Sequence, residues 1–238
     1  MAESLKGRRV LVVGGAGGIG SAIGDALLAR GLSKLIIASS SPHPPRADRS
    51  VEILDVTDAA SIQALAARLA GQPLHAVIDC AGINGRQTVT APDWESMARR
   101  EIEVNYLGML RLAETFAPLL AAQRDACFMV VLSFLSFANL PGMATYCASK
   151  AAAHSALQAV RAMWSPKGVR VCGVYPTAVD TAMSQDLPGP KLSPQALAQE
   201  VVNALLSDAE AIFPGDAAAA FAQYLADPAG MQRAMSQD

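Results

Sequence analysis

Tyr146 and Lys150 are the residues of this chain whose types and spacing most directly indicate chemistry. They lie four positions apart in a run of helix-forming residues, and positions i and i+4 share one face of a helix. A lysine ammonium near a phenol favours the phenolate, so that a tyrosine pKa of about 10 moves toward neutrality. Such a tyrosine can exchange a proton with an alcohol or a carbonyl oxygen. The pair predicts acid–base chemistry, although most tyrosines at this spacing only pack.

A glycine-rich turn near the start of the chain predicts a phosphate-binding site. Residues 10–13 are apolar, as in a buried parallel strand, and residues 18–28 have the composition of a helix. Between them, Gly14, Gly18 and Gly20 permit a tight turn and a close approach of the backbone to a ligand. The N–H groups and the dipole of a helix start favour a pyrophosphate. A flexible turn is the alternative, but the place between strand and helix favours a dinucleotide site.

With both segments in view, the chain resembles the short-chain dehydrogenase/reductase family over nearly its whole length. The family's Thr-Gly-x-x-x-Gly-x-Gly motif matches residues 13–20, with valine in place of the threonine. Its Tyr-x-x-x-Lys motif is present, a serine stands thirteen residues before the tyrosine, and the family's helix asparagine has a counterpart. The catalytic positions that the resemblance implies are Tyr146, Lys150, Ser133 and Asn105.

The resemblance implies a hydride transfer between a nicotinamide cofactor and a carbonyl or secondary alcohol. Tyr146 would protonate the oxygen in reduction and deprotonate it in oxidation, while Lys150 would lower the tyrosine pKa and bind the nicotinamide ribose. Ser133 would donate a hydrogen bond to the reacting oxygen. Asn105 would hold a water that continues the proton path from Lys150. Ser136 is an alternative catalytic serine, but its spacing from Tyr146 is too short.

The same resemblance implies a set of cofactor contacts. Asp55 corresponds to the family aspartate that meets the adenine ring, and a helix cap or turn is its alternative role. Thr181 stands where the family has a carboxamide-binding threonine, although the usual Pro-Gly before it is here Pro176-Thr177. The expected cofactor-binding residues are Gly14, Ala16, Gly17, Gly18, Ile19, Gly20, Ser39, Ser40, Asp55, Val56, Ala81, Gly82, Tyr146, Lys150, Pro176, Thr177, Val179 and Thr181.

The end of the second strand slightly favours NADP(H) over NAD(H). An acidic residue there binds the ribose 2′-hydroxyl of NAD and repels a 2′-phosphate, and this position falls at Ser39. No Asp or Glu occurs between residues 35 and 47. The hydroxyls of residues 39–41 can donate to a phosphate, and Arg46 or Arg49 could pair with it. The family's usual basic residues are absent.

One segment departs from the family pattern beside the expected site. The family's Asn-Asn-Ala-Gly is here Asp79-Cys80-Ala81-Gly82. An ionised aspartate only accepts hydrogen bonds, so either the network differs from the family's or Asp79 keeps a proton.

Composition predicts one dinucleotide-binding and catalytic domain spanning residues 1–238. Hydrophobic residues make up 52% of the chain and aromatic residues 5%. A net charge of −2 argues against nucleic acid and anionic membranes as partners. The four cysteines are scattered along the chain, which predicts reduced thiols. The apolar run near the start of the chain is too short for a secretory signal or a membrane span, so we expect a cytoplasmic protein. His43, His75 and His154 lack partners at ligand spacing, and no metal site is predicted.

Alternating elements predict an α/β fold, a Rossmann-type doubly wound parallel sheet of about seven strands with helices on both faces. The expected strands are 8–13, 34–39, 51–54, 74–79, 126–132, 169–175 and 211–213. The expected helices are 18–30, 58–70, 93–122, 146–164, 194–206 and 216–226. Three prolines in four residues predict that the stretch from 39 to 50 forms an open loop instead of the family's usual helix.

The segment of about residues 182–193 corresponds to the family's substrate-covering loop. An apolar carbonyl substrate, ring-bearing or of medium chain length, follows from an expected wall of Phe134, Leu135, Phe137, Met143 and Met183, unless some of these pack the core or an interface. A ketoreductase acting on acyl thioesters, with Arg124 and Lys167 as basic contacts, is one alternative. A dinucleotide-binding sensor without turnover is another. The resemblance also implies a homodimer or homotetramer.

Overall fold

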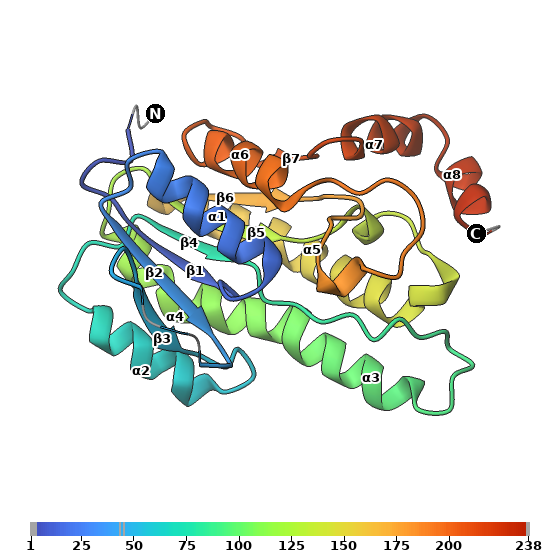
Figure 1. Cartoon of the computed structure of the whole chain (residues 1–238), viewed down its shortest axis with the longest axis horizontal. Coiled ribbons are helices and arrows are strands. Elements are labelled where there is room, and N and C mark those ends of the chain that lie inside the picture. Colours follow the sequence, from blue (N-terminus) through green and yellow to red (C-terminus); the bar gives the residue numbers. More distant parts are fainter. Residues whose placement is uncertain (1–3, 43, 45, 237–238) are drawn as a thin grey trace.

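Seven parallel strands form a single sheet in the order β3-β2-β1-β4-β5-β6-β7 (Figure 1). The structure is a computed structural model, and it describes residues 4–42, 44 and 46–236. The strands are β1 (Arg9–Val13), β2 (Lys34–Ser39), β3 (Ser50–Ile53), β4 (Ala76–Asp79), β5 (Ala126–Val131), β6 (Val169–Val174) and β7 (Ala211–Ile212). The predicted Rossmann-type sheet is confirmed.

Helices cover both faces of the sheet, and the alternation of side chains along β1 shows why. Val10 and Val12 pack into a core cluster with one set of helices, whereas Leu11 and Val13 pack on the opposite side. The first face is covered by α1 (Gly18–Ala29) and α6 (Pro194–Leu205). The second is covered by α2 (Ala59–Leu69), α4 (Met109–Ala121) and α5 (Ala144–Trp164). Burial on both faces accounts for the uninterrupted apolar character of the strands.

The helix predicted over 93–122 is one helical run with a widened turn in its middle. It comprises α3 (Trp94–Glu101), a π-helical segment over Ile102–Gly108, and α4. Asn105 lies within the π-helical segment, and such wide turns are common at functional sites. Gly108, the last residue of this segment, packs closely against the connection between β3 and α2. A Cβ on Gly108 would lie 2.8 Å from Val56 Cγ2.

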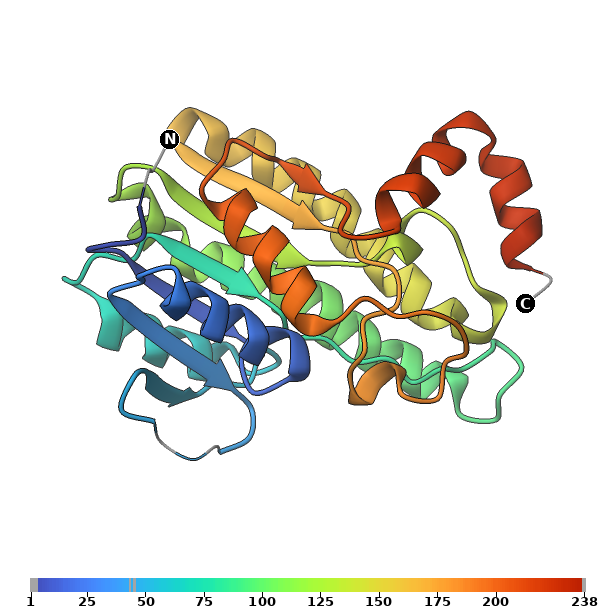
Figure 2. The ribbon, with the colours of Figure 1, turned by 45° about the horizontal axis from the view of Figure 1, so that its top comes forward.

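The chain after β7 forms two short helices at the carboxyl end of the sheet (Figure 2). They are α7 (Ala217–Ala226), which was predicted, and α8 (Pro228–Met235), which was not. The start of α8 is marked by Asp227, whose side chain accepts a hydrogen bond of 2.8 Å from Gly230 N–H. Within the described part of the 40–49 loop there is no helix, as the prolines predict. In the described chain, no helix has the length and apolarity needed to cross a membrane.

Candidate active site

The glycine turn after β1 packs directly against the segment that leaves β4. These two strands are neighbours, but the chain passes to opposite faces of the sheet after them, which makes their carboxyl ends the switch point where ligands bind in such folds. Gly14 has a φ of 69°, and a Cβ there would lie 2.7 Å from Ala81 N. A Cβ on Gly20 would lie 2.5 Å from Gly14 O. Glycine is therefore required for this turn to close.

The start of α1 fits the pyrophosphate of a dinucleotide. Gly17 is its N-cap and provides no side-chain cap for the first-turn N–H groups. Gly18 lies so close to Thr181 that a Cβ would approach the threonine Cγ2 to 2.9 Å. Free amide donors, a helix dipole and the absence of side chains together suit an anionic group.

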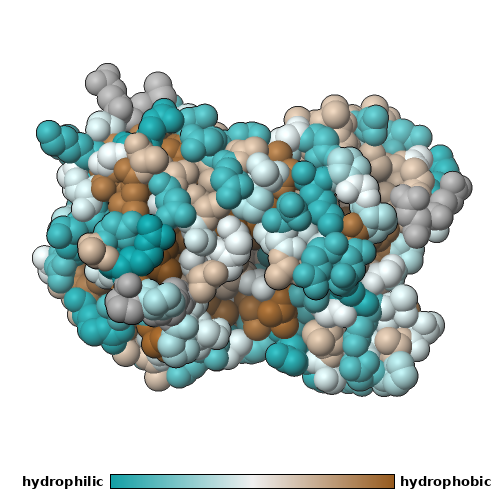
Figure 3. Space-filling model, in the orientation of Figure 1, coloured by the Kyte–Doolittle hydropathy of each residue, from teal (hydrophilic) through white to brown (hydrophobic). Residues whose placement is uncertain are grey.

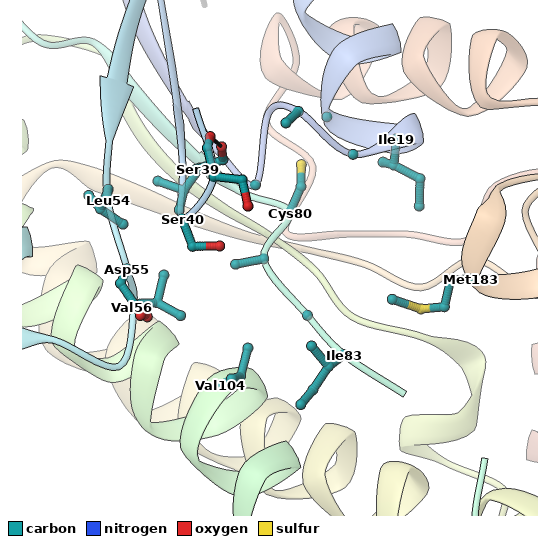
Figure 4. Close-up of a pocket in the computed structure, with 18 of the residues that line it drawn as sticks. Ile19, Ser39, Ser40, Leu54, Asp55, Val56, Cys80, Ile83, Val104 and Met183 are labelled. Carbon is teal, nitrogen blue, oxygen red and sulfur yellow. Dashed lines mark hydrogen bonds between the residues drawn. The ribbon is translucent and has the colours of Figure 1, made fainter. Parts of the chain in front are cut away.

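A cavity of about 710 Å³ runs along this turn (Figure 4). Ser39, Ser40, Asp55 and Val56 lie on one side of it, Ile19 and Met183 on the opposite side, and Val104 and Ile83 at its lower edge in this view. In the space-filling view, apolar side chains lie at the bottom of the hollow in the middle of this face (Figure 3). The predicted cofactor contacts that line the cavity are Gly14, Ala16, Gly17, Gly18, Ile19, Gly20, Ser39, Ser40, Asp55, Val56, Ala81, Gly82 and Thr181.

A second cavity of about 450 Å³ adjoins the first. Ile19, Cys80, Gly82, Thr181 and Met183 line both, so the two cavities meet at these residues. Three of the four predicted catalytic residues line the second cavity, together with the remaining predicted cofactor contacts: Ser133, Tyr146, Lys150, Pro176, Thr177 and Val179.

Ser133 and Tyr146 are positioned by the end of β5 and the first turn of α5. The Ser133 hydroxyl accepts a hydrogen bond of 3.1 Å from Leu135 N–H, which fixes the serine at the start of a short 3₁₀ turn. Tyr146 is 8% exposed, and burial raises the pKa of its phenol, while its hydrogen bond with Ser133 acts in the opposite direction. The expectation that the Tyr146 pKa moves toward neutrality is therefore wrong for this structure: burial is the largest influence on the pKa of the phenol, which holds its proton.

The Lys150 ammonium lies over the Tyr146 ring and is bound by a backbone carbonyl of β5. Its Nζ is 5.8 Å from the centroid of the Tyr146 ring and donates a hydrogen bond of 3.0 Å to Val131 O. Burial lowers the pKa of Lys150 to about 8, and the carboxylate of Asp79 opposes this shift. The ammonium is thus preserved by a buried counter-charge.

Asp79 is the counterpart of the family asparagine and is 3% exposed. Its Oδ1 accepts a hydrogen bond of 3.0 Å from Ala81 N–H. Burial raises the pKa of Asp79 to about 6, whereas the Ala81 amide and Lys150 pull it down. Of the alternatives left open by the sequence, the raised pKa supports the second, in which Asp79 keeps a proton, at pH values below about 6.

Asn105 lies behind the cavities and lines neither of them. Its Oδ1 accepts from Ile83 N–H at 2.8 Å, and its Nδ2 donates to Ile83 O and to Ser149 Oγ, each at 2.9 Å. Ser149 Oγ in turn donates to Tyr146 O at 2.7 Å. Asn105 thereby joins the chain leaving β4 to the helix that carries Tyr146. A water at Asn105 stays a prediction.

The Gly82 backbone passes between Asn105 and Lys150. A Cβ on Gly82 would lie 3.3 Å from Asn105 Oδ1 and 3.4 Å from Lys150 Nζ. The segment after β4 therefore reaches from the first cavity to the predicted catalytic residues.

At the other end of the first cavity, two arginines are engaged in ion pairs. The Arg49 side chain is 5% exposed and bonds Asp25 of α1 at 2.6 Å and Asp48 at 2.9 Å. Arg46 bonds Asp48 at 2.8 Å. Neither arginine lines the cavity, which differs from the expectation that they pair with a 2′-phosphate. Their carboxylate partners compete for the same guanidinium groups.

Asp55 has the turn role considered for it, and contact with an adenine ring stays a prediction. Its Oδ1 accepts hydrogen bonds from Thr57 N–H at 2.9 Å and from Thr57 Oγ1 at 2.8 Å, as in a turn. The residue nevertheless lines the first cavity. The cap of α2 is Asp58, which accepts from Ala60 N–H.

The apolar wall of the second cavity differs in part from the predicted one. Phe134, Leu135, Met143 and Met183 line it, but Phe137 does not. The Phe137 ring instead packs 4.9 Å from Phe221 and 5.0 Å from Tyr175, in an aromatic cluster beside β7. Ser136, the alternative serine, lines neither cavity. Sequence reasoning did not find Arg100 and Glu103 in the first cavity or Gln223, Met231 and Met235 in the second.

The histidines have ordinary structural partners where they are described. His75 Nδ1 accepts from Arg9 N–H at 3.1 Å, and His154 Nδ1 lies 2.8 Å from the Tyr175 hydroxyl. His43 falls outside the described residues. Within the described ranges, no group of three or more His, Cys, Asp or Glu side chains could hold a metal ion.

Comparison with known proteins decides the family. The sequence model of the short chain dehydrogenases matches residues 8–191. This chain belongs to the short-chain dehydrogenase family.

Relatives of this short-chain dehydrogenase include enzymes with different names. It is 31% identical over 195 residues to galactitol 2-dehydrogenase of Rhizobium johnstonii, covering 75% of this chain and 74% of the relative. It is 36% identical over 188 residues to 1-hydroxy-2-glutathionyl-2-methyl-3-butene dehydrogenase of Rhodococcus sp. (strain AD45), covering 76% and 81%.

A crystal structure of a short chain dehydrogenase from Burkholderia cenocepacia J2315 in complex with NADP is similar over nearly the whole chain. It is 32% identical, its TM-score is 0.90, and 98% of each chain is covered. The likeness therefore extends through α7 and α8, beyond the residues that the family model matches.

Asp79→Asn should flatten the pH dependence of stability in the acidic range. The folded-state pKa of about 6 lies above the ordinary value of 3.8, so between these values the native state holds a proton that the unfolded state has released. The free energy of unfolding of the wild type should therefore fall as pH rises through this window, by at most about 3 kcal/mol. Asparagine has no proton to lose. Urea unfolding at several pH values measures the slope.

Asp208→Asn is the matched control. Asp208 is exposed in the connection between α6 and β7, and within the described chain its carboxylate has no ion pair. Its slope should equal that of the wild type. An Asp79→Asn protein whose free energy of unfolding still falls with rising pH as steeply as that of the wild type would contradict the raised pKa of Asp79. The loss of the Lys150 partner lowers the stability of this variant by an amount that does not vary with pH in this range, so it does not affect the comparison of slopes.

Proposed function

We propose that this protein is an NAD(P)-dependent oxidoreductase that transfers a hydride between C4 of the nicotinamide and the carbon of a carbonyl or secondary alcohol. The observation that carries the proposal is the place of Tyr146, Ser133 and Lys150 beside the junction of a dinucleotide-sized cavity and an apolar one. A dinucleotide in the first cavity would present its nicotinamide at that junction.

The mechanism assigns a separate task to each side chain. When bound, the cofactor supplies or accepts the hydride. Tyr146, whose phenol is kept protonated by burial, donates its proton to the carbonyl oxygen during reduction and recovers it during oxidation. Ser133 donates a hydrogen bond to that oxygen as negative charge develops on it. Lys150 stabilises the tyrosinate left after proton transfer and binds the ribose hydroxyls of the nicotinamide half.

Asn105 acts in this scheme through other groups. Its hydrogen bonds to Ile83 and Ser149 hold the segment after β4 against α5 and so keep Lys150 and Tyr146 in register. A water beside Asn105 would relay the proton from Lys150 to solvent.

An apolar ketone or the matching secondary alcohol is the substrate class that the second cavity supports. Phe134, Leu135, Met143 and Met183 form apolar walls. Among the lining residues that the structure describes, Lys150 is the single charged side chain, so the cavity offers little to fix an anionic substrate. The names of the two relatives, a polyol dehydrogenase and a dehydrogenase of a glutathione conjugate, do not agree on one substrate.

The same proposal covers the organisation of the chain. The whole of residues 1–238 works as one cytoplasmic domain, residues 182–193 form its substrate loop, and copies of the chain assemble as a homodimer or homotetramer. The 3₁₀ turn of Ala182–Ser184 and Leu187 support the loop's role, since they lie against one or both cavities.

NADP(H) is the preferred cofactor in this proposal, by a modest margin. Ser39 and Ser40 at the rim of the first cavity put no negative charge near a 2′-phosphate. The related Burkholderia protein was crystallised with NADP. The margin is modest because Arg46 and Arg49 are already paired with Asp25 and Asp48.

Tyr146→Phe should lower kcat/KM by about 10² to 10⁴ because the proton donor is lost. The dissociation constant for NADPH should stay within a few fold of the wild-type value. Activity is measured by NADPH absorbance with a panel of ketones and diketones, and cofactor binding by titration. Tyr224→Phe, which removes a hydroxyl outside both cavities, is the control and should keep full activity.

Two results would overturn the proposed mechanism. One is a Tyr146→Phe protein that retains most of the wild-type kcat. The other is a wild-type protein that binds NADPH at micromolar concentration yet reduces none of the carbonyls, which would favour a dinucleotide sensor.

Ser39→Asp should reverse the cofactor preference. The new carboxylate would accept hydrogen bonds from the ribose 2′-hydroxyl of NADH and repel the 2′-phosphate of NADPH, changing the ratio of kcat/KM values by at least about tenfold. Ser50→Asp adds the same charge at the opposite end of the β2–β3 pair, where Ser50 is paired with Ile36, and should leave the ratio unchanged. A wild-type preference for NADH of tenfold or more would refute the proposed choice.

A further inference from the structure

We propose that α8 is a specificity-determining wall of the substrate cavity and that Gln232 is the residue that positions it. The inference rests on the proposed function, since the cavity concerned is the apolar one beside Tyr146. It adds that Met231 limits the size of the carbonyl substrate that the cavity accepts. The position of Met231 is in turn maintained by the hydrogen bonds of Gln232, which lies outside the catalytic residues.

Two methionines of α8 reach the cavity. Met231 and Met235 both line it, and their separation of four residues puts them on one face of the helix. Met143 and Met183 line other parts of the same cavity. Methionine side chains are unbranched and flexible, so a wall of this kind adapts to apolar ligands of different shape.

Helix α8 is also attached by a pair of hydrogen bonds that the side-chain amide of Gln232 makes. Gln232 Oε1 accepts from Asn139 N–H at 2.9 Å, and Gln232 Nε2 donates to Asn139 O at 2.8 Å. Throughout the described chain, no other hydrogen bond joins residues 228–236 to an element outside α8 and its cap. Asn139 precedes Met143 and α5, so the contact ties α8 to the segment that leads into the catalytic helix.

The helix is otherwise weakly held. None of its residues is buried, and it follows α7 after the single residue Asp227, at the end of the chain in both ribbon views (Figures 1 and 2). A helix of eight residues has little stability of its own. Its position therefore depends on its packing against α7, on the Gln232–Asn139 contact and on apolar packing at the cavity, to which a bound substrate would add.

The chemistry of the wall selects uncharged, apolar groups. Ala220 and Gln223 of α7 and Met231 and Met235 of α8 contribute no charge to the cavity. Arg233, the next residue after Gln232, is exposed and lies 3.8 Å from Asp227, outside the cavity. It provides a control on the same helix.

The experiment compares Met231→Trp, Gln232→Ala and Arg233→Ala in the full chain, using 2-butanone and acetophenone with NADPH. Met231→Trp should reduce kcat/KM for acetophenone at least about tenfold more than for 2-butanone, because the added ring occupies cavity volume. Gln232→Ala should raise KM for acetophenone several fold with kcat nearly unchanged, since the wall is displaced but the proton donor is not. Arg233→Ala should match the wild type, and all variants should bind NADPH equally.

The inference would be overturned if Met231→Trp left the ratio of the kcat/KM values for the two ketones unchanged. It would also be overturned if Gln232→Ala and Arg233→Ala had equal effects on KM for acetophenone. Binding of the uncharged fluorescent probe N-phenyl-1-naphthylamine with NADP present separates this failure from failure of the proposed function. If the wild type reduces no ketone but Met231→Trp alone weakens probe binding, the wall is supported and the proposed function fails. If ketones are reduced but neither the probe nor the ratio responds to Met231→Trp, the wall fails.

Discussion

The close contact between the glycine turn and the segment leaving β4 is the constraint on which the site depends. Gly14 and Ala81 approach so closely that a single methyl group would not fit between them. The contact brings the start of α1, with its free N–H groups, to the same crevice as Cys80 and Gly82. Gly82 then passes between Asn105 and Lys150. Cofactor cradle and catalytic groups are thus connected by one stretch of close-packed backbone.

Electrostatics adds a second level of organisation to this backbone frame. Lys150 and Asp79 are both buried, and each shifts the pKa of the other against the effect of burial. A buried charge without a partner is strongly unfavourable, so the aspartate in place of the family asparagine preserves the ammonium beside Tyr146. The phenol itself is kept protonated, which suits a proton donor. In the mechanism that we propose, the cation serves the tyrosinate formed during reaction rather than a tyrosinate at rest.

The sheet and most of the cavity lining could be predicted from the sequence because both depend on patterns within short segments of the chain. Apolar strands alternating with helices, and glycines between β1 and α1, specify a switch point without any tertiary information. What it did not predict depends on contacts between distant residues. The pairing of Arg46 and Arg49 with Asp25 of α1, the packing of Phe137 against Phe221, and the burial that governs Tyr146 are of this kind. The short helix α8 was not predicted, and it is joined to the rest of the molecule by a contact between Gln232 and Asn139, which are 93 positions apart in the sequence.

The most direct test of the central claim is to follow the hydride itself. Wild-type protein is incubated with acetophenone and NADPH carrying deuterium at C4 of the nicotinamide, prepared separately with the label on each face. The account predicts that one of the two cofactors, and only one, yields 1-phenylethanol with deuterium on the carbinol carbon, because the ring is held with one face toward the substrate cavity. Alcohol without deuterium from either cofactor, or labelled equally by both, would contradict it.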